Sequence, residues 1–68
     1  MKPVYSVEAS VWDEWKECYV PEVLFKSDDY QEALLWYDKE TGVNEDTPKV
    51  SLEMDNGECK ETLFVKEM

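Results

Sequence analysis

The side chains in this sequence that could do chemistry are mainly carboxylates. Seventeen Asp and Glu residues stand against seven Lys in a chain of 68 residues, and the chain has no Arg and no His. Two carboxylates can act as general acid and base where a pocket separates their pKa values. A chain this short leaves little room for such a pocket, and His, the commonest general base, is missing. We therefore expect a protein that is not an enzyme.

Metal and thiol chemistry are also poorly supported. The segment DKETGVNED, residues 38–46, offers oxygen ligands as a calcium loop does, but it lacks the Gly at the sixth position and the bidentate Glu at the twelfth position of that motif. Cys18 and Cys59 stand far apart, and no His is available to complete a zinc site. We expect no metal and no cofactor, and two reduced thiols in the core rather than a disulfide.

The charge balance points to the class of partner. A net charge of −10 argues against direct binding of nucleic acid, because phosphate contacts need clusters of Lys and Arg. It argues equally against anionic membranes. Such a surplus can steer a protein toward basic partners over about 8 to 10 Å at physiological salt. The alternative is an acidic surface that only keeps the protein soluble.

The sequence shows neither a signal peptide nor a membrane span. The first ten residues, MKPVYSVEAS, contain no apolar run, and no stretch approaches 18 apolar residues. We expect a cytoplasmic protein.

The elements that must position these groups begin with a hairpin from Tyr5 to Val20. If Asp13 and Glu14 form its loop, Trp12 lies opposite Trp15, and alternation sorts the residues onto two faces. The inner face then carries Val7, Ala9, Val11, Cys18 and Val20, and the outer face carries Glu8, Ser10, Trp12, Trp15, Glu17 and Tyr19. Pro21 ends the pairing or confines it to an edge, because it lacks an amide donor.

A helix is predicted from Asp28 to Glu40, after the capping residues Ser27 to Asp29. Its apolar stripe consists of Tyr30, Ala33, Leu34 and Tyr37. Leu35 and Trp36 fall outside that stripe and need either a wider core or a partner. Gly42 lies where a left-handed cap commonly ends a helix.

A second hairpin is predicted from strands Lys49 to Met54 and Glu58 to Lys66, around the turn residues Asn56 and Gly57. A two-residue loop places Glu53 opposite Lys60 as an outward charge pair. The inward residues are then Val50, Leu52, Met54, Cys59 and Leu63.

Two hairpins around one helix predict a single small α+β domain over residues 1–68, with ββαββ order. The strands form a four-stranded antiparallel sheet, and the helix packs on one face. A chain of this size buries only ~60% of the surface that its unfolded form exposes, so its stability should be modest.

The uncovered sheet face would carry a strip that is both aromatic and acidic. Tryptophans across a hairpin can merely stabilise it, by ~0.2 to 1 kcal/mol. Aromatic side chains ringed by charge are also typical of binding hot spots, and both interpretations stay open. The candidate partner-binding residues are Glu8, Trp12, Asp13, Glu14, Trp15, Glu17 and Tyr19 on the hairpin, with Leu35 and Trp36 on the helix.

No family motif stands in the sequence, but in size and charge the whole chain resembles a class of small acidic inhibitors. These are the proteins that phages and mobile elements use against host nucleases, including DNA mimics, antirestriction proteins and anti-CRISPR proteins. The resemblance implies a stoichiometric inhibitor that occupies the nucleic-acid-binding site of a basic protein. The alternative is an interaction module or accessory subunit that binds a partner, or forms a homodimer, through its aromatic sheet face.

Overall fold

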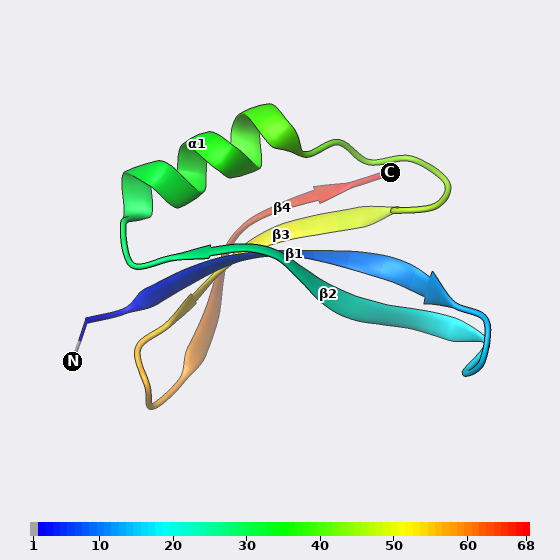
Figure 1. Ribbon diagram of the computed structural model, residues 1–68, viewed down its shortest axis with the longest axis horizontal. Coiled ribbons are helices and arrows are strands. Elements are labelled where there is room, and N and C mark those ends of the chain that lie inside the picture. Colours follow the sequence, from blue (N-terminus) through cyan, green and yellow to red (C-terminus); the bar gives the residue numbers. More distant parts are fainter. Residues whose placement is uncertain (1) are drawn as a thin grey trace.

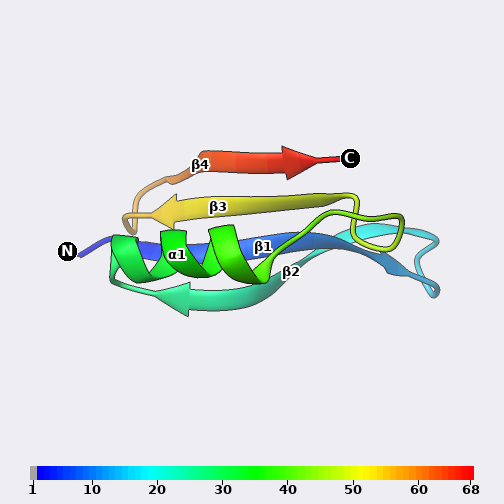
Figure 2. The same ribbon diagram turned by 90° about the horizontal axis from the view of Figure 1, so that it is seen from above.

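The chain forms one four-stranded sheet with one helix on it. A computed structural model describes residues 2–68. The elements are β1 (Val4–Asp13), β2 (Cys18–Ser27), α1 (Tyr30–Glu40), β3 (Lys49–Asp55) and β4 (Lys60–Glu67). All strand pairs are antiparallel, in the order β2-β1-β3-β4. Helix α1 covers one face of the sheet and leaves the other face open (Figures 1 and 2). The predicted ββαββ fold is confirmed.

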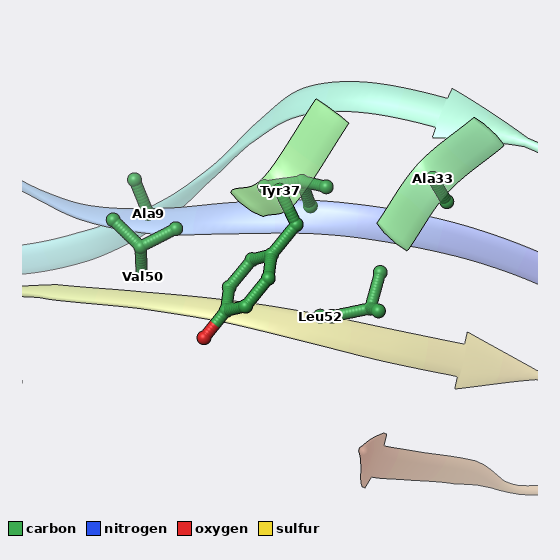
Figure 3. Packing of buried hydrophobic residues seen from close by; sticks show 6 residues of the cluster. Ala9, Ala33, Tyr37, Val50 and Leu52 are labelled. Carbon is green, nitrogen blue, oxygen red and sulfur yellow. The ribbon is translucent and has the colours of Figure 1, made fainter. Parts of the chain in front are cut away.

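The core lies between α1 and the two central strands. Four residues of β1 and β3 pack there against Ala33 and Tyr37 of the helix (Figure 3). The strand residues are Val7, Ala9, Val50 and Leu52. Burial of these few apolar side chains is the main favourable contribution to folding.

Helix α1 begins close to its predicted position because Asp29 caps it. The Asp29 carboxylate accepts hydrogen bonds from the amides of Gln31, at 2.9 Å, and Glu32, at 3.3 Å. These are two of the amides that lack a partner inside the helix. The negative charge also opposes the positive end of the helix dipole.

The predicted left-handed cap at Gly42 is wrong. The helix ends in extended backbone at Thr41, with φ −117° and ψ 145°. The Lys66 ammonium donates to the carbonyl oxygens of Tyr37, at 3.0 Å, and Thr41, at 3.4 Å. A lysine from β4 thus satisfies carbonyl groups that a glycine cap would otherwise help to satisfy.

The first hairpin has a longer loop than predicted, and its register differs. Asp13 pairs with Cys18, so that four residues, Glu14 to Glu17, form the loop. The Asp13 carboxylate accepts from the amides of Trp15 and Lys16, and Glu17 adopts a left-handed φ of 53°. Two-residue primed turns need Gly or Asn, which this segment lacks, and the longer loop avoids that need. Because its length is still even, Trp12 and Tyr19 keep the predicted face.

Strand β2 continues to Ser27, well past the predicted end at Val20. A β-bulge between Val7 and Glu8 shifts the register, so that Val7 pairs with Phe25 and Glu8 with Val23. Pro21 lies within this strand, at the edge of the sheet, where its missing amide breaks no ladder.

The second hairpin also has a four-residue loop, Asn56 to Cys59, instead of the predicted two-residue loop. The Asn56 side chain accepts from the amides of Glu58 and Cys59, and Gly57 has a positive φ of 92°. A bulge between Leu52 and Glu53 then shifts the pairing with β4. Glu53 is on the turn side of this bulge, and the longer loop places it opposite Thr62 instead of Lys60.

The two cysteines are free but exposed, so their predicted place in the core is wrong. Cys18 directly follows the first loop, and Cys59 ends the second. The longer loops put both thiols at hairpin ends, outside the area that α1 covers.

Leu52 and Leu35 offer a matched test of this core. Leu52 is fully buried and Leu35 is 56% exposed. We expect Leu52→Ala to lower the free energy of unfolding by about 2 to 5 kcal/mol, because it leaves a cavity. Leu35→Ala should change it by less than about 0.5 kcal/mol. Urea unfolding followed by circular dichroism measures both, and equal losses would contradict this placement of the core.

Candidate protein-binding surface

The first hairpin projects beyond the rest of the sheet. Strand β1 pairs with β3 only from Val4 to Ala9, but with β2 as far as Asp13. Residues 10–21 therefore form a two-stranded extension, which we call the ribbon (Figures 1 and 2). An isolated two-stranded hairpin is only marginally stable, so contacts between its side chains matter.

One such contact joins Trp12 and Tyr19 on the open face of the ribbon. These residues are register partners, and their rings meet edge to face with centroids 5.1 Å apart. Both side chains remain about half exposed, at 51% and 48%. Tyr19 thus takes the place opposite Trp12 that the sequence analysis gave to Trp15.

Trp15 lies instead at the tip of the ribbon, and 97% of its surface is exposed. Glu14 precedes it, Lys16 and Glu17 follow it, and all three are exposed, whereas Asp13 is partly buried. The Asp13 carboxylate holds the turn through its two amide hydrogen bonds. The tip thus presents a large aromatic side chain together with two exposed carboxylates and one exposed lysine.

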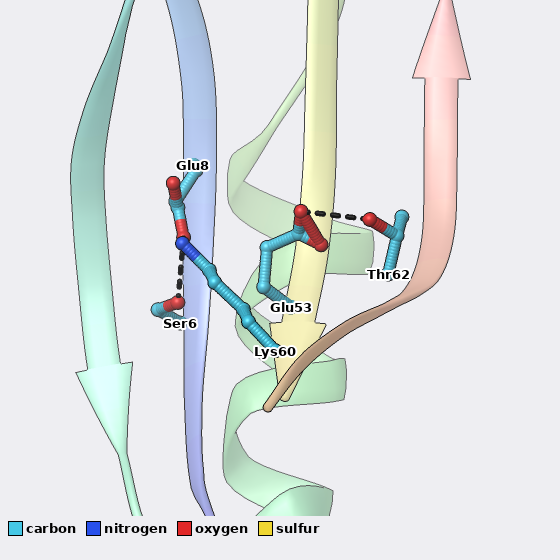
Figure 4. Close-up of polar contacts among 5 residues, drawn as sticks. All are labelled: Ser6, Glu8, Glu53, Lys60 and Thr62. Carbon is cyan, nitrogen blue, oxygen red and sulfur yellow. Dashed lines mark hydrogen bonds and ion pairs between the residues drawn. The ribbon is translucent and has the colours of Figure 1, made fainter. Parts of the chain in front are cut away.

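Glu8 has a different environment from the other acidic candidates. Its side chain is only 12% exposed and forms an ion pair with Lys60. The same carboxylate oxygen accepts a hydrogen bond from the Ser6 hydroxyl at 3.0 Å (Figure 4). The charge of Glu8 is therefore balanced within the protein and adds little to an acidic strip.

The centre of the open face is polar. Thr62 donates to one oxygen of the Glu53 carboxylate at 2.8 Å (Figure 4), and among the described residues the other oxygen is buried without a partner. The hydrogen bond to Glu8 raises the pKa of Lys60 above its usual 10.5. The charges of Glu8, Glu53 and Asp55 act in the same direction, and burial opposes them. Aromatic character is thus confined to the ribbon end of this face.

The two helix candidates lie in the other layer and differ from each other. Trp36 is partly buried and stacks on Phe25 of β2, with ring centroids 5.1 Å apart and planes 6° from parallel. It widens the core, which was one of the two alternatives for this residue. Leu35 is exposed on the outer side of α1. Neither residue is on the face that carries Trp12 and Tyr19.

At the end of the open face away from the ribbon is a hollow that the sequence analysis did not identify. Its volume is about 300 Å³. Its lining residues are Lys2, Val4, Ser6, Glu8, Val23, Lys26, Asp55, Gly57 and Lys60. Three of the seven lysines of this acidic chain thus surround one hollow. The hollow forms because the strand order β2-β1-β3-β4 brings the end of β2 and the start of β4 to the same end of the sheet. No local sequence pattern predicts this order, so the sequence alone gave no signal for the hollow.

Comparisons with protein-family models, curated proteins and solved structures gave no match. Within residues 2–68 no group of three or more acidic or Cys side chains is arranged to hold a metal ion. In the same part of the chain, α1 is too short and too polar to span a membrane.

The two ribbon tryptophans should differ in their contribution to stability. Trp12→Ala removes the contact with Tyr19 and should cost about 0.5 to 1.5 kcal/mol of unfolding free energy. Trp15→Ala removes an exposed side chain and should cost less than about 0.5 kcal/mol. Urea unfolding compares them, with Tyr19→Ala as the matched partner of Trp12→Ala. A larger loss of unfolding free energy for Trp15→Ala than for Trp12→Ala would show that the Trp15 side chain is packed and not exposed.

The ion pair between Lys60 and Glu8 should be visible in a titration. The pKa of Lys60 is raised in the folded state, so its contribution to stability is complete below the unfolded pKa of about 10.4. That contribution to stability is lost as pH rises through the higher pKa that Lys60 has in the folded state. We expect NMR of the Lys60 side chain to show titration above 10.5, and Glu8→Gln to lower the midpoint. An unchanged midpoint in that variant would rule out Glu8 as the main cause.

Proposed function

We propose that this chain is a non-enzymatic inhibitor that binds a basic, nucleic-acid-binding protein through the tip of its ribbon. The observation that carries the proposal is Trp15, which is 97% exposed at a tip that also exposes Glu14, Lys16 and Glu17. The proposed target is a host nuclease or DNA-binding protein, and the proposed origin is a phage or mobile element. This is the mode of a DNA mimic, as in antirestriction or anti-CRISPR proteins.

The shape of the ribbon supports insertion into a cleft. It is two strands wide, and adjacent strands lie only about 4.8 Å apart. Trp is among the residues most enriched in binding hot spots, which lie in desolvated pockets. Glu14 and Glu17 at the same tip could replace phosphate groups in contacts with Lys and Arg.

The distribution of lysines supports electrostatic attraction of a basic partner. Lys60 is paired with Glu8, and Lys66 donates to helix carbonyls while its ammonium lies 4.5 Å from the centre of the Tyr37 ring. Two of the seven lysines are therefore occupied within the fold. Most of the net charge of −10 faces solvent and would speed association at low salt.

A plain interaction module is the second candidate function. It is favoured by the half-exposed Trp12 and Tyr19, which form an aromatic patch on the open face. Such a module would bind mainly through apolar contacts, and its affinity would change little with salt.

The test captures the target and then asks which part of the chain holds it. The protein is immobilised, a bacterial lysate is passed over it, and bound proteins are eluted with duplex DNA. We expect a DNA-binding protein to elute, and the free chain to block its binding to labelled duplex DNA. Trp15→Ala should weaken this inhibition by about 30-fold or more, the loss expected for a hot spot.

Two charge-reversal variants provide the matched control. Glu14→Lys with Glu17→Lys alters the tip, and Glu45→Lys with Asp46→Lys alters the exposed loop before β3 by the same total charge. We expect the tip variant to lose inhibition and the loop variant to keep most of it. If the tip and loop variants lose inhibition equally, overall charge and not the ribbon is responsible. If both variants keep inhibition and Trp12→Ala loses it, the interaction module is favoured.

A further inference from the structure

The open face of the sheet carries opposite charges at its two ends. Lys2 and Lys26 line the hollow at one end, and among the described residues neither is in an ion pair. Glu14 and Glu17 are exposed at the ribbon tip, at the other end. The hollow has three lysines against the two carboxylates Glu8 and Asp55, a small positive excess in a chain whose net charge is −10.

The hollow suits an aromatic side chain as well as negative charge. Val4 and Val23 contribute apolar surface, and Val23 is 55% exposed. Lysine stems add further apolar contact, and their ammonium groups attract the face of a Trp ring most strongly. An exposed Trp with more carboxylates than lysines around it therefore complements the hollow in both shape and charge. The ribbon tip is such a group.

The spacing along β1 allows both contacts to form at once between two copies. Ser6, at the hollow, precedes Ser10 by four residues, and Glu14, at the ribbon tip, follows it by four. A two-fold axis through the open face near Ser10 therefore brings the ribbon tip of each copy over the hollow of the other. We infer that two copies of the chain associate in this way, each placing its Trp15 tip in the lysine-lined hollow of the other.

The size and symmetry of the face are suitable for such a dimer. The molecule extends 37 Å along the strands and 15 Å across them, measured between Cα atoms (Figure 2). With side chains this face approaches the ~800 Å² per partner of a standard interface. The contact is isologous, so it closes at two copies and does not propagate into a fibre. Ser10 and its register partner Pro21 lie near the axis and are uncharged, so no like charges meet there.

The dimer would hide the side chains that the proposed function needs. Self-association occupies the tip of the ribbon, so a basic partner can bind only the monomer. The dimer itself does not depend on the proposed function, because it follows from the two ends of the open face alone. Dilution or raised salt would release the ribbon, since the contacts are largely ionic.

Sedimentation equilibrium over a range of protein concentrations, at low and at high salt, tests the inference. We expect the wild-type chain to dimerise at low salt and to dissociate as salt rises. The tip variant, Glu14→Lys with Glu17→Lys, and a hollow variant, Lys2→Glu with Lys26→Glu, should each raise the dimer dissociation constant by about tenfold or more. Glu45→Lys with Asp46→Lys and the helix variant Lys39→Glu serve as controls and should dimerise as the wild type does.

Mixing the two reversed variants gives the sharpest result. In the mixed pair, a basic tip meets an acidic hollow, and an acidic tip meets a basic hollow. Both contacts are therefore complementary, and we expect heterodimers to form from two variants that are each monomeric. Circular dichroism of each variant checks that the fold is kept.

Three outcomes would overturn the inference. The first is a wild-type chain that stays monomeric at millimolar concentration and low salt. The second is a dimer that both reversed variants retain. The third is a mixture of the variants that forms no heterodimer. If the wild type stays monomeric while added inorganic phosphate shifts the NMR signals of Lys26 and Ser6, the hollow is an anion site instead. None of these results bears on inhibition of a captured DNA-binding protein, so the proposed function stands or falls separately.

Discussion

The contact between α1 and the first half of β1 determines the rest of this structure. The helix has 11 residues and at ~1.5 Å per residue is about 16 Å long. Five residues of a strand, at ~3.3 Å each, have the same length. Strand β1 has ten residues, so the helix can cover only about half of it. Val7 and Ala9 lie under Ala33 and Tyr37 and form the core, and the strand beyond them continues without cover as the ribbon.

The few lysines of this acidic chain are placed where the fold needs a cation. Lys66 joins the C-terminal strand to the end of α1 through the Tyr37 and Thr41 carbonyl groups. Lys60 crosses the open face to Glu8, whose side chain is largely buried. A buried carboxylate without such a partner would carry a large desolvation cost. The remaining carboxylates lie mostly on the surface, so the protein keeps a strong negative field without destabilising its small core.

Residue patterns alone predict the fold and the faces of the strands, but not their registers. Alternation is a property of each strand, and it placed Val7 and Ala9 inside and Trp12 and Tyr19 outside whatever the loop length. Register depends on the loops and bulges. Asp13 and Asn56 each hold a four-residue loop through bonds to backbone amides, and each hairpin also contains a β-bulge. Since each loop differs from prediction by an even number of residues, the faces agree as far as the bulges while the partners change. Beyond the bulge in the second hairpin, Lys66 pairs with Val50 and reaches the helix.

The candidate site was predictable only in part for the same reason. The exposed carboxylates and aromatics of the tip follow from a local turn, so the sequence between Trp12 and Tyr19 was sufficient to identify them. The pairing of Glu8 with Lys60 and the lysine-lined hollow depend on β4 and β2 flanking the central strands, which no local pattern encodes.

Separating the ribbon from the core has a consequence for its use in binding. A residue in the core cannot change without a loss of packing, and in a domain this small such a loss is a large part of the total stability. Trp15 and its neighbouring carboxylates contribute little to the core, so they can be arranged for a partner with little effect on folding. The ribbon still needs an ordered shape, because a flexible loop would lose conformational entropy on binding. The edge-to-face contact of Trp12 with Tyr19 and the Asp13 turn supply that order from within the ribbon itself. Under the proposed function, stability and recognition would therefore reside in different halves of the same two strands, with the tip free to fit a target while the helix and β3 maintain the fold.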